Sequence, residues 1–369
     1  MRHLYVHAPF CSRRCSYCDF SIAVRRDVPA QAFAASIGVE LRSRITNLIV
    51  PSLTDVETLY IGGGTPSKLG ALGIRQLYTE LTAAGLRLAP GAEFTIEANP
   101  EDITPAAAAA WLEAGVNRLS IGIQSFDPEV LAWMHRTHTA EEAAAAAQAA
   151  RSAGFRDISV DLIYALPERL NRDWDADLSR ALDLAPEHLS LYGLTVEPHT
   201  PLGRWTARGA EVPAADDRAA DQFLHAHERL SVAGFEHYEV SNYALPGRRS
   251  RHNSSYWRRV PYLGLGPSAH SFDGETRRWN VAALAEWERE FAAGNDPVGG
   301  TETLDRSQIE SELLYLGLRS DAGIELTGAN ADRAAAWVRE QWAVQDGART
   351  RLTPEGWLRL DALVGSLQL

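Results

Sequence analysis

All three cysteines of this 369-residue chain lie close together, at Cys11, Cys15 and Cys18. Three thiols on one short loop can converge on a single inorganic centre. Three thiolates can hold three irons of a 4Fe-4S cluster and leave the fourth iron open, whereas electron-transfer clusters normally have four cysteine ligands. The alternative is a structural zinc site completed by His7 or Asp19, but such sites usually draw their ligands from two separated pairs. The spacing therefore favours an iron-sulfur cluster, and an open iron would imply chemistry at that cluster.

A glycine-rich loop follows the second apolar strand pattern of the chain. Gly62, Gly63 and Gly64 are consecutive and precede Thr65. Each glycine weakens ordinary structure by roughly 0.5 to 1 kcal/mol, so three in a row indicate that a ligand or another backbone approaches closely. A cofactor is the natural candidate, and a tight strand-to-helix turn is the alternative.

A third motif places a histidine beside two aromatic residues, at His252, Tyr256 and Trp257. This composition suits ligation of haem iron and coverage of a flat macrocycle, although a surface loop packed on the core is the plainer interpretation. Arginines cluster around the same segment, at Arg248, Arg249, Arg251, Arg258 and Arg259. They could pair with carboxylates such as porphyrin propionates, or form a solvated loop.

Six short β-rich runs alternate with helical patterns, which predicts parallel βα units. The predicted strands cover residues 4–7, 57–61, 93–97, 118–123, 157–162 and 188–192. Thr139 to Glu142 forms a capping box before an alanine-rich helix that Gly154 ends. Every polar or glycine-rich motif of the first half follows a strand, and active sites of parallel α/β folds assemble at the carboxyl edge of the sheet.

The pattern changes after about residue 240. Helical segments are expected over 281–291 and 307–318, and short helical and turn patterns follow from residue 334. We therefore expect a domain over residues 1–240 and a second one over 241–369.

Bulk composition narrows the class of protein. The net charge of -12 disfavours generic binding to nucleic acid or anionic lipid. No apolar run reaches the length of a transmembrane segment, and the first residues lead straight into a strand rather than a signal peptide. Reduced cysteines without a disulfide pattern fit a cytoplasmic protein.

The cysteine run closely follows an apolar strand and resembles the signature of the radical S-adenosylmethionine (SAM) superfamily. That family cleaves SAM at the open iron of a 4Fe-4S cluster. The resemblance implies an α/β fold, a partial (β/α)6 TIM-like barrel with a smaller, mainly helical C-terminal domain. The glycine loop resembles the motif that meets the methionine part of SAM.

Further residues resemble the coproporphyrinogen III oxidase branch of that superfamily, in which an acid, a glutamine, an arginine and an aspartate contact SAM. Glu97, Gln124, Arg136 and Asp161 stand in the matching local settings. Carboxylates accept hydrogen bonds from ammonium and ribose hydroxyl groups, and arginine pairs with a carboxylate. The resemblance adds pocket or outer contacts from Tyr5, Tyr17, Gly63, Gly64, Thr65, Thr195 and His270.

The run His-Asn-x-x-Tyr-Trp from His252 resembles a haem-binding signature of the HemW-like haem chaperones. Two departures separate the chain from the oxidase: Asp19 and Phe20 follow the third cysteine where the oxidase continues towards a further cysteine, and only ten residues precede Cys11. The resemblance implies a chaperone that binds haem b through His252 and passes it to acceptor haemoproteins, membrane-bound respiratory cytochromes among them. The cluster and SAM would then support homodimer formation, acceptor docking or haem release.

Two alternatives stay open at this point. An oxygen-independent coproporphyrinogen III oxidase, or another radical SAM enzyme acting on a tetrapyrrole, would use the same cluster for hydrogen abstraction. A zinc-stabilised interaction protein would contain zinc and no acid-labile sulfide. The sequence leaves undecided whether the chain is an enzyme.

Overall fold

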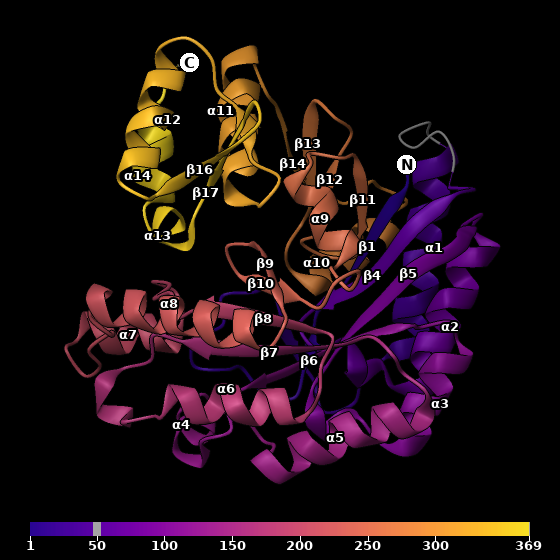
Figure 1. Ribbon diagram of the computed structural model, residues 1–369. Helices are drawn as coiled ribbons and strands as arrows, with labels where there is room; N and C mark the ends of the chain where they lie inside the picture. Colours follow the sequence, from indigo (N-terminus) through magenta and orange to yellow (C-terminus); the bar gives the residue numbers. More distant parts are fainter. Residues whose placement is uncertain (47–52, 369) are drawn as a thin grey trace.

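The computed structural model describes residues 1–46 and 53–368, and its largest feature is a mixed sheet of 12 strands (Figure 1). The strands in spatial order are β14 (Val298–Thr303), β13 (Thr276–Asn280), β12 (His270–Phe272), β11 (Tyr262–Leu265), β1 (His3–Ala8), β4 (Val56–Gly63), β5 (Leu88–Ala98), β6 (Arg118–Gln124), β7 (Ile158–Tyr164), β8 (His188–Gly193), β10 (Asn242–Ala244) and β9 (Glu236–Glu239). Strands β1, β4, β5, β6, β7 and β8 are parallel to one another. These six are the six predicted strands, so the α/β partial barrel is confirmed.

Helices cover the outer face of this sheet. They are α1 (Ala30–Thr46), α2 (Gly70–Ala83), α3 (Pro105–Glu113), α4 (Pro128–Trp133), α5 (Ala140–Ala153), α6 (Trp174–Asp183), α7 (Pro201–Ala207) and α8 (Asp216–Val232), with 3-10 turns at η1 (Pro66–Leu69), η2 (Pro100–Asp102) and η3 (Glu168–Leu170). Helix α5 begins with the predicted capping box of Thr139 and Glu142 and ends at Gly154, which has φ 116°. Both signals of the sequence are therefore confirmed.

The core lies between the sheet and these helices. Leu4 and Val6 of β1 have no exposed surface, and they belong to the same cluster as Phe33 and Ile37 of α1. Side chains alternate across a strand, so His3, Tyr5 and His7 of β1 point to the inner face instead. The outer face of the sheet thus forms the hydrophobic core with the helices, and the inner face holds the polar side chains that could form a site.

Strands β11 to β14 continue this sheet beyond the expected domain boundary at residue 240, because β11 pairs in parallel with β1. Helix α9 (Arg251–Trp257) lies in the connection before β11, and α10 (Leu284–Ala292) begins three residues later than the expected helix at 281. We propose that the division falls after Thr303, where the last strand of the large sheet ends.

The remaining residues form a smaller unit with its own core, which includes Leu318, Trp337 and Trp357. Its elements are α11 (Arg306–Arg319), β15 (Ile324–Glu325), α12 (Ala329–Arg339), β16 (Ala343–Asp346), β17 (Arg349–Leu352), α13 (Pro354–Trp357) and α14 (Leu360–Gly365). A short parallel pair, β2 (Phe10–Cys11) and β3 (Ala23–Val24), flanks the cysteine loop. Within the described residues, none of these helices combines the length and apolar character that crossing a membrane requires.

Candidate functional site

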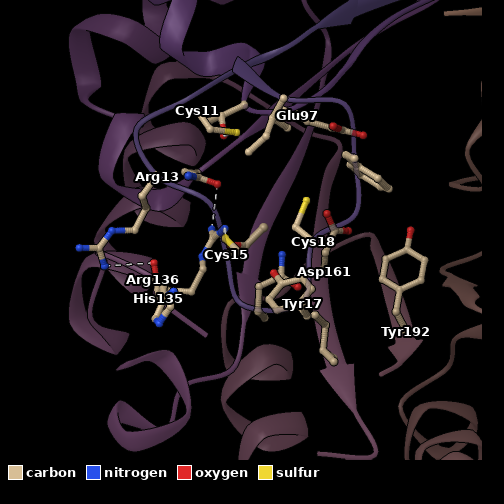
Figure 2. Close-up of a pocket in the computed structure, with 18 of the residues that line it drawn as sticks. Cys11, Arg13, Cys15, Tyr17, Cys18, Glu97, His135, Arg136, Asp161 and Tyr192 are labelled. Atoms are coloured by element: carbon tan, nitrogen blue, oxygen red, sulfur yellow. Dashed lines mark hydrogen bonds between the residues drawn. The ribbon is translucent and has the colours of Figure 1, made fainter. Parts of the chain in front are cut away.

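A cavity of about 490 Å³ opens at the carboxyl ends of the parallel strands (Figure 2). It brings together residues that are up to 186 positions apart in the chain, because Cys11 and Glu197 both line it. Most of the residues expected to contact a cofactor border this cavity, namely Cys11, Cys15, Cys18, Tyr17, Gly63, Gly64, Thr65, Glu97, Gln124, Arg136, Asp161 and Thr195. The cavity is therefore the candidate cofactor site.

The cysteine loop crosses one wall of this cavity. Its ends are held by backbone hydrogen bonds between β2 and β3, and Cys11 Sγ lies 3.3 Å from Thr65 Oγ1. Burial raises the pKa of Cys11 and raises that of Cys18 to about 11, so these thiols need a cation to displace their protons.

The three sulfurs are spread around the cavity rather than gathered at one point (Figure 2). Over residues 1–46 and 53–368, no three His, Cys, Asp or Glu side chains converge closely enough to hold a single metal ion. A zinc ion needs four ligands at about 2 Å, whereas a 4Fe-4S cluster binds each thiolate at a different iron. The donor set and its spread fit the cluster better than zinc.

Close contacts with neighbouring residues explain the glycines at the end of strand β4. A Cβ at Gly64 would lie 2.7 Å from the Pro9 carbonyl oxygen, and one at Gly63 would lie 2.7 Å from the His7 ring. Gly63 also has φ 114°, which disfavours any side chain. The glycines thus let the strand end pack against the cysteine loop, with Gly63 and Gly64 still facing the cavity.

Two half-buried carboxylic acids, Glu97 and Asp161, face the cavity from β5 and β7. Burial raises the pKa of Glu97 to about 7, and burial raises that of Asp161 to about 6. Glu97 accepts from the Tyr60 hydroxyl at 2.8 Å and from the Gly63 amide at 3.0 Å, and Asp161 accepts from Ser120 at 3.0 Å. Such a pair would be stabilised by a ligand that brings positive charge or hydroxyl donors.

Arg136 reaches the opposite side of the cavity. Its Nη2 donates to Asn99 Oδ1 at 2.8 Å and to the Gly122 carbonyl at 2.5 Å, and its Nη1 lies 3.9 Å from Cys15 Sγ. The guanidinium therefore joins the ends of β5 and β6 to the cysteine loop. Its position suits a ligand carboxylate bound beside the cysteines.

Gln124 lines the cavity from a strained position at the end of β6, with φ 71°. The next two residues are held by the buried carboxylate of Asp177, which accepts from Ser125 Oγ at 2.7 Å and from the Phe126 amide at 2.9 Å. Arg172 pairs with Asp177 at 3.0 Å. Helix α6 thus fixes the loop that carries Gln124.

Among the cavity residues that were not predicted as site residues, Asn99, Ser120 and Tyr192 stand out. Asn99 binds Arg136, Ser120 donates to Asp161, and Tyr192 lines the cavity with 43% of its surface exposed. Asn99 and Tyr192 stand at the ends of predicted strands, so their strand-end position was the available signal. Ser120 lies inside a strand, where only the alternation of side chains indicates the inner face.

Five of the expected site residues lie outside the cavity lining: Tyr5, His252, Tyr256, Trp257 and His270. His270 is exposed and stacks on Trp279 with ring centroids 5.6 Å apart. Trp257 packs under the Arg319 guanidinium, 4.4 Å from its ring centroid. The expected contacts of Tyr5 and His270 with SAM stay predictions, since neither residue borders the space where it would bind.

His252 is buried on the inner face of the barrel, with 1% of its surface exposed. Its Nδ1 lies 2.7 Å from Thr58 Oγ1, and its Nε2 lies 2.8 Å from the Tyr256 hydroxyl. Burial lowers the pKa of this histidine to about 3, so the ring is neutral. Both nitrogens are thus engaged, and an iron ion would have to displace one of these partners.

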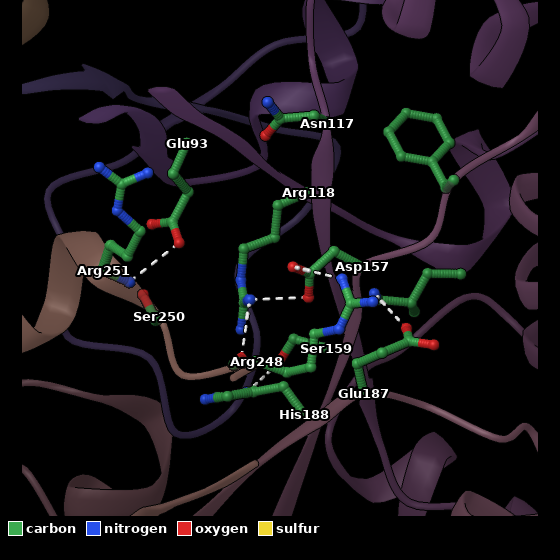
Figure 3. A network of polar contacts seen from close by, with 12 residues as sticks. Glu93, Asn117, Arg118, Asp157, Ser159, Glu187, His188, Arg248, Ser250 and Arg251 are labelled. Carbon is green, nitrogen blue, oxygen red and sulfur yellow. Dashed lines mark hydrogen bonds and ion pairs between the residues drawn. The ribbon is translucent and has the colours of Figure 1, made fainter. Parts of the chain in front are cut away.

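The helix that carries His252 is fixed at its first turn by Glu93. This carboxylate accepts from the backbone amides of Arg251 and His252, each at 2.9 Å, and Figure 3 shows the surrounding polar network. Arg118 joins this network by binding Asp157 at 2.7 Å and the Arg248 carbonyl at 3.0 Å. The preceding loop is therefore anchored to three strands of the barrel.

The arginine cluster is largely engaged within the protein. Arg249 pairs with Glu236 and Asp321 at 2.9 and 2.6 Å, and Arg259 pairs with Glu312 at 2.5 Å. In this arrangement the two guanidinium groups hold the hairpin of β9 and β10 and helix α11 in place. They are not free to pair with propionates.

Comparisons with known proteins agree with the geometry. Residues 5–181 match the radical SAM superfamily. The heme chaperone HemW of Mycobacterium tuberculosis is 37% identical over 99% of this chain and 94% of its own length, and that of Escherichia coli is 39% identical over 72% of this chain and 69% of its own. The coproporphyrinogen III oxidase structure (HemN) of Escherichia coli has a TM-score of 0.83, covers 98% of this chain and 89% of its own, and is 22% identical.

Proposed function

Because the chain belongs to the HemW family of the radical SAM superfamily, we propose that it is a haem chaperone that binds haem b and passes it to acceptor haemoproteins. The observation that carries the proposal is the similarity to relatives named as heme chaperones along 99% of the chain. Membrane-bound respiratory cytochromes are the proposed acceptors, and self-association of the chain is part of the proposal.

Cys11, Cys15 and Cys18 would hold a 4Fe-4S cluster, and the open iron would bind exchangeable SAM. The cluster supplies one-electron chemistry when it is bound. Arg136 suits the SAM carboxylate, and Glu97 and Asp161 suit its ammonium and ribose hydroxyl groups. Gln124, Thr65 and Thr195 complete the wall, while Tyr17 closes it beside the cysteines.

Haem is the cargo in this proposal, and His252 is its proposed iron ligand. The histidine is enclosed, so haem uptake requires one of its ring-nitrogen hydrogen bonds, to Thr58 or to Tyr256, to break and the ring to leave its stack on Tyr60. Tyr256 and Trp257 stand on the same short helix and would move with it. The described arrangement is thus a closed form of the haem motif.

The charge of the cavity argues against the oxidase alternative. Its acidic lining residues are Asp19, Glu97, Glu101, Asp161 and Glu197, and its arginines are Arg13 and Arg136. Coproporphyrinogen III carries four propionates, and each buried carboxylate needs a paired cation or several donors. Two arginines cannot pair with four propionates, and five acidic side chains share the same lining. This wall suits a cationic ligand better than a tetracarboxylate.

The test titrates haem b into the anaerobically reconstituted protein and follows the Soret band, beside a coproporphyrinogen III assay with SAM and a strong reductant. We expect stoichiometric haem uptake, transfer to an apo-haemoprotein, and no conversion of coproporphyrinogen. His252→Ala should weaken haem binding at least about tenfold, because the iron loses a ligand. His225→Ala removes an imidazole from the surface of α8 and should leave the affinity unchanged.

Each arm has a result that contradicts it. Turnover of coproporphyrinogen would replace the chaperone with the oxidase. Unchanged haem affinity in His252→Ala, with thermal unfolding that shows a folded variant, would remove His252 as the ligand. Zinc without acid-labile sulfide after reconstitution would refute the cluster.

A further inference from the structure

A single aromatic ring separates the cofactor cavity from the haem motif. Tyr60 of β4 donates its hydroxyl hydrogen to Glu97 Oε1 at 2.8 Å, and Glu97 lines the cavity. On its other side, the Tyr60 ring stacks on His252 with centroids 5.0 Å apart and an interplanar angle of 27°. Tyr60 is itself buried, with 9% of its surface exposed. It therefore touches both sites while facing neither solvent nor cavity.

Several contacts hold His252 in its enclosed position. Its ring nitrogens are hydrogen-bonded to Thr58 and Tyr256, and its backbone amide donates to Glu93. Its ring also stacks on Tyr5 and, more closely, on Tyr60. Of these partners, Tyr60 is the one that donates a hydrogen bond to the cavity residue Glu97. Any change at Glu97 that alters the hold on Tyr60 is thus felt by the histidine.

We propose that Tyr60 is a positioning residue that couples ligand binding in the cavity to the release of His252 for haem, an inference that rests on the proposed function. Glu97 lines the same cavity as Asp161, so it ionises more readily when a cationic ligand enters. An ionised carboxylate accepts a stronger hydrogen bond from the Tyr60 hydroxyl than a neutral acid does. The ring is then held more firmly against His252.

The direction of the coupling follows from this order of events. A cationic cavity ligand stabilises the enclosed position of His252 and therefore weakens haem binding. Removal of the ligand loosens Tyr60 and favours the open form that binds haem. Linkage requires the reverse effect to be equal, so haem weakens the binding of the cavity ligand by the same factor.

The experiment measures haem b affinity of the reconstituted holoprotein with and without saturating SAM, in the absence of reductant so that SAM is not cleaved. Wild type should bind haem about fivefold or more weakly when SAM is present, within the usual range of such couplings. Tyr60→Phe keeps the stacked ring and removes only the hydroxyl, so its ratio of the two affinities should fall to about one. SAM affinity measured with and without haem should give the same ratios.

Tyr243→Phe is the matched control. This tyrosine is also buried, it stacks on His237, and its hydroxyl has no hydrogen-bond partner within the described part of the chain. The control should keep the wild-type ratio. A merely structural role for Tyr60 would change both affinities without changing their ratio.

The outcomes separate the two proposals. Failure of wild type to bind haem would sink the proposed function and this inference with it. Haem binding that SAM leaves unchanged in wild type, or a wild-type ratio in Tyr60→Phe, would overturn the coupling alone.

Discussion

Replacement of Glu97 by glutamine should change how the stability of the chain depends on pH. Burial raises the pKa of Glu97 from its usual 4.5 to about 7 in the folded chain, so the folded state holds this proton more tightly than the unfolded state does. The stability from protonation is therefore complete below about pH 4.5 and is lost as pH rises through about 7. Glutamine cannot ionise and removes this term.

The size of the effect follows from the two pKa values. One pKa unit corresponds to 1.36 kcal/mol. With pKa values of 4.5 in the unfolded chain and about 7 in the folded chain, the free energy of unfolding of wild type should fall by about 2 to 3 kcal/mol between pH 5 and pH 8. Glu97 is half-buried at the cavity wall, so solvent screening brings the expected change towards the lower end of this range. Burial also raises the pKa of Asp161, which lowers the stability in the same pH range. Asp161 is present in wild type and in the variant, so its effect largely cancels in the difference between their free energies of unfolding.

The assay is urea unfolding of the cluster-free, full-length chain at several pH values between 5 and 8, for wild type and Glu97→Gln. The free energy of unfolding of the variant minus that of wild type should rise by about 2 to 3 kcal/mol across this range. Glu113→Gln, which alters a glutamate with 72% of its side chain exposed, gives the effect of the substitution itself. A difference that stays constant from pH 5 to 8 would refute the raised pKa of Glu97.

Two further predictions concern the framework. Asp177→Ala should lower the free energy of unfolding in urea by about 3 to 5 kcal/mol, because it leaves Arg172 buried and unpaired. The double variant Asp177→Leu/Arg172→Met should lower it by less, and equal decreases in the two variants would contradict the argument. Trp111→Ala should lower the free energy of unfolding by about 3 to 5 kcal/mol, since the side chain has no exposed surface. Trp111→Phe should lower it clearly less, because the indole nitrogen has no hydrogen-bond partner in the described part of the chain. Equal unfolding midpoints for the two variants would contradict this prediction.

The sequence predicted the six parallel strands because each is a short run that contains β-branched or aromatic residues and alternates with a helical pattern. It did not predict β11 to β14, which are short strands of three to six residues. Tyr262 to Leu265 carries no local sign that it pairs with β1, more than 250 residues earlier in the chain. That pairing is a tertiary contact, which local strand propensity does not predict.

The cavity residues were predictable where a strand-end position agreed with the family resemblance, as for Glu97 and Gln124. The surroundings of His252 were not predictable from the motif. Its partners Thr58 and Tyr60 lie on β4, almost two hundred residues away, and the tertiary packing of α9 against β4 places them beside the histidine. A motif can identify the residues of a site, but their exposure depends on packing against strands that are distant in the sequence.

The enclosed histidine also bears on why a haem carrier would retain a SAM pocket. A binding site that must release its cargo needs a way to change affinity, and a ligand changes affinity only if it contacts the two states differently. The distance from the cavity to the histidine is short, since Tyr60 contacts both His252 and the cavity residue Glu97. Under this proposal SAM contributes by being bound, and its cleavage is not required for the haem to be released.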